Sequence, residues 1–323
     1  MSAKTMTREE WLAERRKGVG GSDAAAILGI SPFRTAVDVW LDKTGRKPPT
    51  EETEAMRIGT ELEDFVARRY VEKSGHAVQR FNRMLKRGVL LGNLDRLVVP
   101  DGEKVASHMG EVRTDTLLEC KTASRDWGDG VPLYYQTQVQ HYMGLDERLE
   151  HADVAVLFLV RKRFETYRVE RDDDAIRLMS ERLTAWWNKY VLGDEMPPPA
   201  NEEDCKALWT HSNPGKSVEA SDEVGDAVSR YRELTETAEA AEAEMKTLRD
   251  EICAAMGDAE VLTSPLDGKP IVTWKSAKDR AKTDWEAVAK ELGATPEQIE
   301  AHTTLVAGAR RFMLKTEAKK GTR

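Results

Sequence analysis

The stretch TLLECKTAS, residues 116–124, has the composition of a mainly apolar β-strand that carries Glu119 and Lys121 one residue apart. Because side chains alternate across a strand, these two charged groups lie on one face, and Leu118 and Cys120 lie on the other. Two interpretations are open. The pair is either ordinary decoration of a solvent-facing strand or half of a catalytic site.

Two further acids lie in apolar elements earlier in the chain. Asp95 lies in LLGNLDRLVV (90–99), and the residues between this segment and the first stretch, 100–115, are polar and rich in turn formers. The two segments can therefore pair as neighbouring strands, which would bring Asp95 beside Glu119. Glu63 lies in a helix that the apolar spacing predicts over residues 55–75.

Carboxylates together with a lysine are a set of groups suited to phosphodiester hydrolysis. Carboxylate oxygens are ligands that Mg²⁺ prefers, and the lysine can orient or deprotonate the attacking water or balance charge. The alternative for each residue is plain: a Glu-x-Lys pair is common on strands, Asp95 can cap a turn, and Glu63 can be solvated. Their order, each within an apolar element, favours a metal site.

Two other segments carry candidate residues. In RRKGVGGSDAAAIL (15–28) two glycines precede a helix start that would bind an anion, with Arg15 within reach; the alternative is that Ser22 or Asp23 only caps the helix. In YYQTQVQHYMGL (134–145), Gln138 lies among apolar and aromatic residues. It would bond the attacking water or Lys121, or only satisfy the backbone.

Composition sets limits on the class of protein. The 323 residues carry a net charge of −8, so any nucleic-acid surface must be a local basic patch. Three widely separated cysteines argue against zinc ribbons, iron–sulfur clusters and disulfide frameworks, and fit a reducing cytosol. The chain begins without an apolar segment of the signal-peptide kind, and its longest apolar run, 154–160, is too short to span a bilayer.

The clearest boundary is the proline run 197–199, which predicts a first domain over 1–196 and a C-terminal region over 197–323. Residues 222–256 form a long predicted helix with a coiled-coil-like seam, followed by a β-hairpin. The last fifteen residues hold six basic side chains and one acid. We expect this region to contact DNA or a partner protein or to stabilise oligomers; the alternative is an arm that only packs on the first domain.

Five segments in this order resemble one known family. They are WLAERRKGVGGSDAAAILG, GTELED, GNLD, LLECKT and YYQTQVQ, and the resemblance covers about residues 8–195. The family is that of the YqaJ viral recombinases, relatives of lambda exonuclease. The resemblance implies an α/β fold of the PD-(D/E)XK nuclease type, a mixed central sheet flanked by helices. GNLD departs from the family's Pro-Asp, although the acid is kept.

The resemblance also implies roles for single residues. Asp95, Glu119 and the main-chain carbonyl of Cys120 correspond to metal ligands, with Glu63 a candidate further ligand on its helix. Lys121 corresponds to the catalytic lysine, and Gln138 to the glutamine that completes the active site. Arg15 and Ser22 correspond to residues that hold the 5′-phosphate of DNA.

The implied activity is a Mg²⁺-dependent 5′→3′ exonuclease, with Mn²⁺ as an alternative ion, that leaves 3′ overhangs on double-stranded DNA. A single-strand annealing protein of the RecT or Red beta kind would load on them in DNA recombination, in the cytoplasm of a bacterial host with a phage or prophage origin. A homo-oligomer, in the form of a trimeric ring, is also implied. The competing hypotheses are a nicking or restriction endonuclease of the same fold and a catalytically silent DNA-binding protein.

Overall fold

The computed structural model describes residues 8–48, 53–103, 112–128 and 130–304. The chain divides into two compact units, Met1–Leu208 and Trp209–Arg323. The basic tail predicted at the C-terminus lies outside the described residues.

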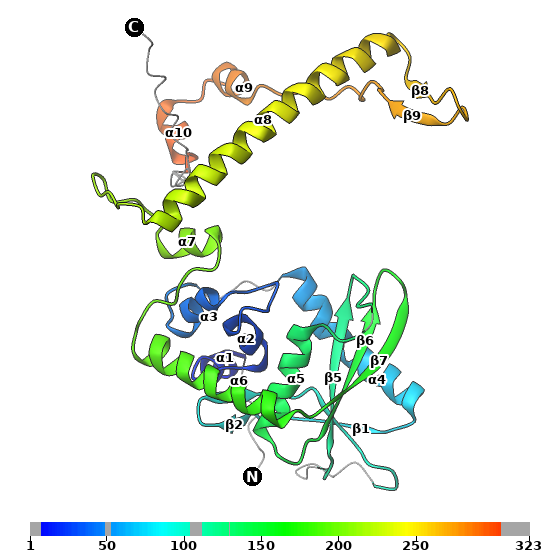
Figure 1. Ribbon diagram of the computed structural model, residues 1–323, viewed down its shortest axis with the longest axis vertical. Helices are drawn as coiled ribbons and strands as arrows, with labels where there is room; N and C mark the ends of the chain where they lie inside the picture. The colour runs from blue at the N-terminus through cyan, green and yellow to red at the C-terminus, as the bar shows by residue number, and fades with distance from the viewer. Residues whose placement is uncertain (1–7, 49–52, 104–111, 129, 305–323) are drawn as a thin grey trace. The chain divides into compact units, whose positions relative to one another are not determined.

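A mixed five-stranded sheet in the order β1-β4-β5-β6-β7 forms the centre of the first unit (Figure 1). Strands β5 and β6 are parallel, and the other neighbouring pairs are antiparallel. A separate hairpin, β2–β3, lies outside this sheet. The strands of the unit are β1 (Val78–Arg80), β2 (Leu85–Arg87), β3 (Leu90–Gly92), β4 (Arg96–Val98), β5 (Thr116–Ala123), β6 (His151–Phe158) and β7 (Arg163–Glu170).

Helices cover the sheet, which confirms the predicted fold class of a mixed central sheet flanked by helices. Helix α4 packs against β5 and β6, and α5 packs against β6 and the β2–β3 hairpin. Helices α2 and α6 pack against α5, α3 packs against α2, and η1 contacts α3 and α6. The helices of the unit are α1 (Arg8–Arg15), α2 (Gly21–Ile27), α3 (Ala36–Lys43), α4 (Glu54–Ser74), α5 (Leu133–Leu145), α6 (Asp173–Trp186), the π-helical turn η1 (Trp187–Leu192) and α7 (Glu202–Leu208).

The two faces of the sheet bury different residues because side chains alternate along each strand. Leu118 in β5 packs in a cluster with Val66 and Tyr70 of α4. Its neighbour Leu117 packs in a second cluster with Val139 of α5. Both leucines are fully buried, and removing each side chain from water contributes about 2 kcal/mol to the free energy of folding. The face that carries Leu117 also carries Glu119 and Lys121.

Local signals in the sequence explain where several helices begin and end. The hydroxyl of Thr53 accepts a hydrogen bond from the Met56 amide at the start of α4. Gly75 ends the same helix with a left-handed φ of 80°, which a glycine adopts without steric cost. Thr35 caps α3 in the way that Thr53 caps α4.

The segment around Asp95, which the sequence predicts as one strand, is interrupted. Residues 76–85 contain β1 and the start of β2, whereas 89–99 contain β3 and β4, which belong to different sheets. Gly88, with φ of 60°, makes the tight turn that pairs β2 with β3. The amide of Val19 donates to the carbonyl of Val89, and Leu91 donates back to Val19, so this hairpin is tied to the N-terminal helices instead of the main sheet.

The first unit extends twelve residues beyond the boundary predicted at residue 196. Asp204 in α7 is buried and accepts hydrogen bonds from the Thr35 hydroxyl at 2.7 Å and the Ala200 amide at 2.8 Å. Leu208 packs against the cluster that includes Trp40 and Trp186. The proline run therefore precedes the last helix of this unit, which returns to pack on it.

The second unit contains a long helix, a hairpin and two short helices. These are α8 (Asp222–Met256), β8 (Val261–Thr263), β9 (Pro270–Thr273), α9 (Trp285–Glu291) and α10 (Pro296–Ala301). The Ser221 hydroxyl accepts from the Val224 amide and starts α8 where the sequence predicts its start. The antiparallel β8–β9 pair is the predicted hairpin.

Candidate active site

Glu119, Lys121 and Gln138 meet on one face of the sheet. The ammonium of Lys121 donates to Glu119 Oε1 at 2.6 Å and to Gln138 Oε1 at 3.2 Å. Gln138 Nε2, from α5, donates to the same Glu119 oxygen at 2.7 Å. Lys121 also lies 4.7 Å from the centre of the Tyr135 ring. The one-residue spacing in β5 therefore places the acid and the amine together, as the sequence predicts.

Asp95 joins this group from the neighbouring strand. It directly precedes β4, which pairs with β5 through Arg96 opposite Leu118. Its Oδ2 accepts a hydrogen bond from the Cys120 amide at 2.8 Å. The Asp95 side chain therefore bonds to β5 just beyond the point where the backbone pairing of β4 and β5 ends. Asp95 and Glu119 are thus neighbours, as the pairing of the two segments predicts.

Asp95 lies in an environment that disfavours its negative charge. Burial, and then repulsion by Glu119, raise the pKa of Asp95 well above its usual value. The pKa of Lys121 is raised, because attraction by Glu119 and Asp95 outweighs the opposing effect of burial. Lys121 is therefore held as an ammonium, which suits charge balance and orientation of a water molecule better than deprotonation of one.

One oxygen of the site has no partner. Glu119 Oε2 is buried and accepts no hydrogen bond from any described group. A buried carboxylate oxygen in this state is costly unless a cation or a donor approaches it. With Asp95 beside it and the Cys120 carbonyl on the same strand, the donor set is hard oxygen, and these residues fit a divalent cation such as Mg²⁺.

The third acid is turned to a different partner. Glu63 Oε1 accepts a hydrogen bond from Arg96 Nη1 at 2.6 Å, and Arg96 also pairs with Asp64. No three His, Cys, Asp or Glu side chains of the described residues are grouped as a metal site. Glu63 is therefore close enough to raise the pKa of Asp95 but is not assembled with Asp95 and Glu119.

Alternation along the strands explains this separation. Arg96 and Val98 of β4 point to the face covered by α4, where Glu63 and Asp64 lie. Glu119 and Lys121 point to the face covered by α5, which carries Gln138. The thiol of Cys120 belongs to the α4 face as well, and burial there raises its pKa.

The predicted phosphate-binding residues are together in a second cluster. Arg15 Nη2 donates to the Ser22 hydroxyl at 2.7 Å. Asp23 is fully buried and accepts from Arg34 at 2.9 Å, from Lys43 at 2.6 Å and from the Gly20 amide at 3.0 Å. Burial opposes the charge of Asp23, but Lys43, then Arg15 and Arg34 hold its pKa below the usual range.

The helix α2 starts at Gly21, and its N-cap is Gly20, so Ser22 lies inside the first turn and does not cap it. Asp23 is the residue whose side chain closes the cap, by accepting from the Gly20 amide. Four basic side chains surround two carboxylates here, which leaves the cluster with an excess of positive charge. The charged side chains are Arg15, Arg16, Arg34, Lys43, Asp23 and Asp42.

Tyr142 connects the two clusters. Its hydroxyl accepts from Gln138 Nε2 at 3.0 Å, and Gln138 in turn contacts Glu119 and Lys121. On its other side the ring lies against Gly21, where a Cβ atom would come within 2.6 Å of it. The close approach that Gly21 allows is therefore to a tyrosine of α5.

Sequence reasoning missed Arg96, Lys43, Arg34 and Tyr142. No spacing rule marks them, because each is brought in by tertiary contacts. One signal existed for Lys43: it lies on the helix that carries buried Val39, Trp40 and Leu41, and its own side chain is 1% exposed. A buried lysine needs an acidic partner, and Asp23 is that partner.

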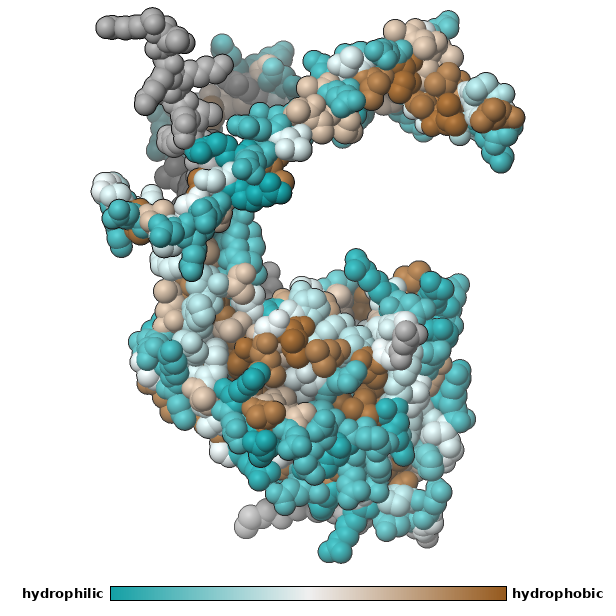
Figure 2. All heavy atoms as spheres, in the orientation of Figure 1, coloured by the Kyte–Doolittle hydropathy of each residue, from teal (hydrophilic) through white to brown (hydrophobic). Residues whose placement is uncertain are grey.

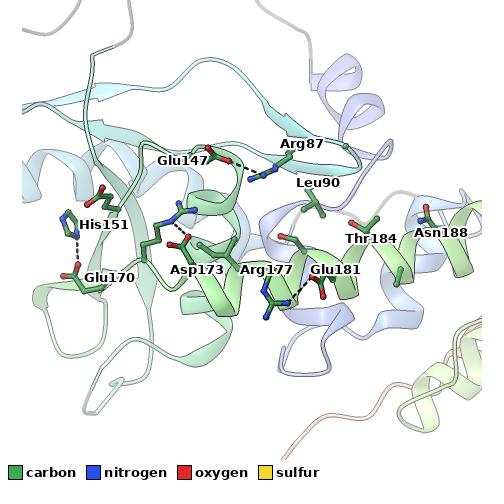
Figure 3. Close-up of a pocket in the computed structure, with 16 residues that line it drawn as sticks. Arg87, Leu90, Glu147, His151, Glu170, Asp173, Arg177, Glu181, Thr184 and Asn188 are labelled. Atoms are coloured by element: carbon green, nitrogen blue, oxygen red, sulfur yellow. Dashed lines mark hydrogen bonds and ion pairs between the residues drawn. The ribbon is translucent and has the colours of Figure 1, made fainter.

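A wide surface pocket of about 1300 Å³ lies elsewhere on the first unit (Figure 3). Charged residues of α6 and of the ends of β6 and β7 line it. Several of its charges are already paired: Arg87 with Glu147 at 3.3 Å, His151 with Glu170 at 2.5 Å, and Arg177 with Glu181 at 3.2 Å. None of the predicted site residues lines this pocket, so its size does not make it a candidate active site.

Comparison with known proteins gives matches in a family and in one curated relative. The model of the YqaJ-like viral recombinase domain matches residues 10–147. The uncharacterized protein YqaJ of Bacillus subtilis strain 168 is 34% identical over 307 residues, which cover 88% of this chain and 92% of that protein. In the described residues no helix is long and apolar enough to cross a membrane.

Solved structures resemble the chain more distantly. The alkaline exonuclease LHK-Exo of Laribacter hongkongensis is 21% identical, with a TM-score of 0.45, over 57% of this chain and 93% of that one. A phage-related exonuclease of Haemophilus somnus 129PT is 15% identical, with a TM-score of 0.40, over 57% of this chain and 100% of that one.

Proposed function

Because this chain belongs to the family of YqaJ-like viral recombinases, we propose that it is a divalent-metal-dependent 5′→3′ exonuclease acting on double-stranded DNA. Resection of linear duplex ends would leave 3′ overhangs for a single-strand annealing protein of the RecT or Red beta kind. The unpartnered, buried oxygen of Glu119 beside half-buried Asp95 is the observation that carries the proposal. Such a site attracts a hard cation.

The residues of the first cluster have separate tasks in this proposal. Asp95, Glu119 and the Cys120 carbonyl would hold the ion, which when bound supplies Lewis-acid polarisation of the phosphate and stabilises charge on the leaving oxygen. Lys121, held as an ammonium, orients the attacking water and balances phosphate charge. Gln138 fixes Lys121 and Glu119 relative to each other through one amide. Glu63 acts through Arg96, which donates to the Asp95 carbonyl at 2.6 Å.

The second cluster would bind the end of the DNA. Its excess of positive charge suits a terminal 5′-phosphate, and Arg15 and Ser22 are already joined by a hydrogen bond that a phosphate oxygen can share. Asp23 holds the Arg34 and Lys43 side chains near the same place. Through Tyr142 this end-binding cluster is linked to the cleavage site, so occupation of one positions the other.

Linear duplex labelled at either 5′ or 3′ end, with and without Mg²⁺, tests the activity. We expect Mg²⁺-dependent release of the 5′ label first and no attack on closed circular duplex. Lys121→Met and Glu119→Gln should lower the rate at least about 100-fold while circular dichroism stays unchanged. Cleavage of the closed circular duplex would indicate an endonuclease. No cleavage of any substrate with Mg²⁺ or with Mn²⁺ would indicate a catalytically silent DNA-binding protein.

The end-binding role has its own test. Wild-type protein should degrade 5′-phosphorylated ends faster than 5′-hydroxyl ends, and Arg15→Ala or Ser22→Ala should reduce that ratio at least about 10-fold. Because the ratio compares the rates of one variant on the two kinds of DNA end, a general loss of activity lowers both rates and leaves the ratio unchanged. Equal rates on both ends in the wild type would contradict the role.

A further inference from the structure

Helix α8 carries an uninterrupted heptad seam. Ten residues follow one another at alternating intervals of three and four, over the whole length of the helix, and all are apolar. They are Val224, Ala227, Tyr231, Leu234, Ala238, Ala241, Met245, Leu248, Ile252 and Ala255. A repeat of 3.5 residues keeps such positions on one stripe, which is the pattern of a helix that pairs with another helix.

No described element covers this seam. Among the described helices and strands none packs along α8, and the buried clusters of the chain contain none of its residues. Leu234 is 51% exposed, Met245 61% and Leu248 49%. Figure 2 shows apolar residues at the surface of this unit, where the C-terminal half of α8 meets the hairpin. A helix with an apolar stripe of this length is stable in water when the stripe is buried.

The seam is complementary to itself when reversed. Consider two antiparallel copies of α8 with Ala238 of one against Ala241 of the other. In every layer from this centre toward the helix ends, two different side chains then face each other. Leu234 then faces Met245, Tyr231 faces Leu248, Ala227 faces Ile252 and Val224 faces Ala255. In a parallel pair Ala227 would face Ala227 and Tyr231 would face Tyr231, so thin and thick layers would alternate and leave voids.

Charges beside the seam match the same arrangement. In the antiparallel pair Arg230 lies opposite Glu251 of the second copy, and by symmetry this contact occurs twice. In the single chain Arg230 makes a surface ion pair with Glu233 at 2.8 Å, which it can exchange at little cost. The central alanines allow the two backbones to approach closely.

We propose that α8 pairs with α8 of a second copy of this chain as an antiparallel coiled coil, which joins two copies through their second units and is separate from any contact between the first units. This interface involves no residue of the candidate active site. The proposal therefore stands or fails independently of the nuclease activity.

Sedimentation equilibrium of the full chain measures the association. We expect association through α8 at tens of micromolar, and Ala241→Glu, which places two unpaired charges in the central layer, should raise the dissociation constant of this contact at least about 100-fold. Ala243→Glu is the matched control, because it puts the same side chain two residues away on the opposite side of the helix. A monomeric wild type, or an assembly whose size Ala241→Glu leaves unchanged, overturns the proposal.

Disulfide cross-linking reads the orientation. In a background with Cys205→Ser and Cys253→Ser, one tagged chain carries Ala227→Cys and a differently tagged chain carries Ile252→Cys. Oxidation should give the mixed cross-linked dimer, and Ala227→Cys alone should not cross-link to itself. Self-cross-linking of Ala227→Cys would indicate parallel helices and overturn the antiparallel arrangement.

Discussion

At the scale of single residues, the two acids of the candidate active site lower the stability of the fold. Asp95 and Glu119 repel each other in a buried place, and Lys121 offsets this only in part, because it contacts one Glu119 oxygen and leaves the other without a partner. A protein that keeps such a group pays for it in folding free energy. Binding of a divalent cation would reverse this cost.

Metal binding should therefore stabilise the fold. At a Mg²⁺ concentration ten times its dissociation constant, the free energy of unfolding should rise by about 1.4 kcal/mol. Asp95→Asn keeps the acceptor for the Cys120 amide but removes the charge, so its thermal midpoint should not respond to Mg²⁺ or to chelator. Asp174→Asn, whose native carboxylate is 91% exposed, is the control and should respond like wild type. An equal response of Asp95→Asn would exclude Asp95 as a ligand.

His141 gives the stability a dependence on pH. It is buried, and its Nε2 donates to the Leu91 carbonyl at 2.8 Å. Burial lowers the pKa of His141 below its usual value of 6.5, so the unfolded chain binds a proton that the folded chain does not. Stability from this group is full above the unfolded pKa and falls as the pH drops toward the folded one.

Urea unfolding at pH 7.5 and 5.5 tests this dependence. His141→Gln keeps a donor for the Leu91 carbonyl but does not titrate. Wild type should lose up to about 1.4 kcal/mol more than His141→Gln between these two pH values. Equal losses in the two proteins would show that folding does not lower the pKa of His141.

At the scale of elements, the packing of α2 on α5 depends on one glycine. Gly21 lies in the first turn of α2, and a Cβ there would approach the Tyr142 ring within 2.6 Å. The neighbouring Gly20 is more open: a Cβ would lie 3.4 Å from Asp23 Oδ2. The two positions therefore form a matched pair for substitution by alanine.

We expect Gly21→Ala to lower the free energy of unfolding by about 1–3 kcal/mol, since the added methyl group must displace a packed ring. Gly20→Ala should change stability by much less, and denaturant unfolding distinguishes them. Because Tyr142 contacts Gln138, Gly21→Ala should also slow DNA cleavage. If Gly20→Ala destabilises the protein as much as Gly21→Ala does, the need for glycine arises from the loop before α2 and not from the contact of α2 with Tyr142.

The sequence predicts elements well where local pattern decides them. The spacing of apolar residues and the cap at Ser221 define α8, and Gly75 ends α4 where predicted. Prediction from the sequence fails where the structure of a segment depends on which strand it pairs with. The apolar run 89–99 looks like one strand, but its first half pairs with β2 and its second half with β5. Propensity does not say which neighbour a strand will find.

The same division applies to the candidate site. Glu119 and Lys121 share a face because strand periodicity is local, so their contact is predictable from two positions in one strand. The pairing of Glu63 with Arg96 depends on which face of β4 meets α4, and no pattern in either segment gives that. Motif order therefore predicts which residues gather, but their partners follow from the fold.

At the scale of the whole molecule, the chain divides into two units that differ in how much apolar surface they bury. The hydrophobic clusters of the described residues all lie in the first unit, around the sheet and around α2, α3 and α6. The second unit offers surface instead of core, chiefly on α8. The chemistry proposed for the first unit and the association proposed for the second are compatible, because a change in one unit need not disturb the other.

Two truncations test where the first unit ends. A chain ending at Leu208 keeps α7, in which Asp204 accepts from Thr35 and Leu208 packs against the cluster around Trp40. A chain ending at Met196, before the prolines, loses both. We expect the longer fragment to unfold cooperatively and to retain DNA cleavage, and the shorter one to be less stable by about 2 kcal/mol.

Leu208→Ala in the full chain separates the two contributions to that difference. It removes the side chain that packs against the cluster around Trp40 and leaves the hydrogen bond between Thr35 and Asp204 in place, so it should account for about 1 kcal/mol of the loss. Urea unfolding of the four proteins gives the comparison. If the two fragments are equally stable, α7 is an appendage, and the unit ends at the proline run as the composition of the chain suggests.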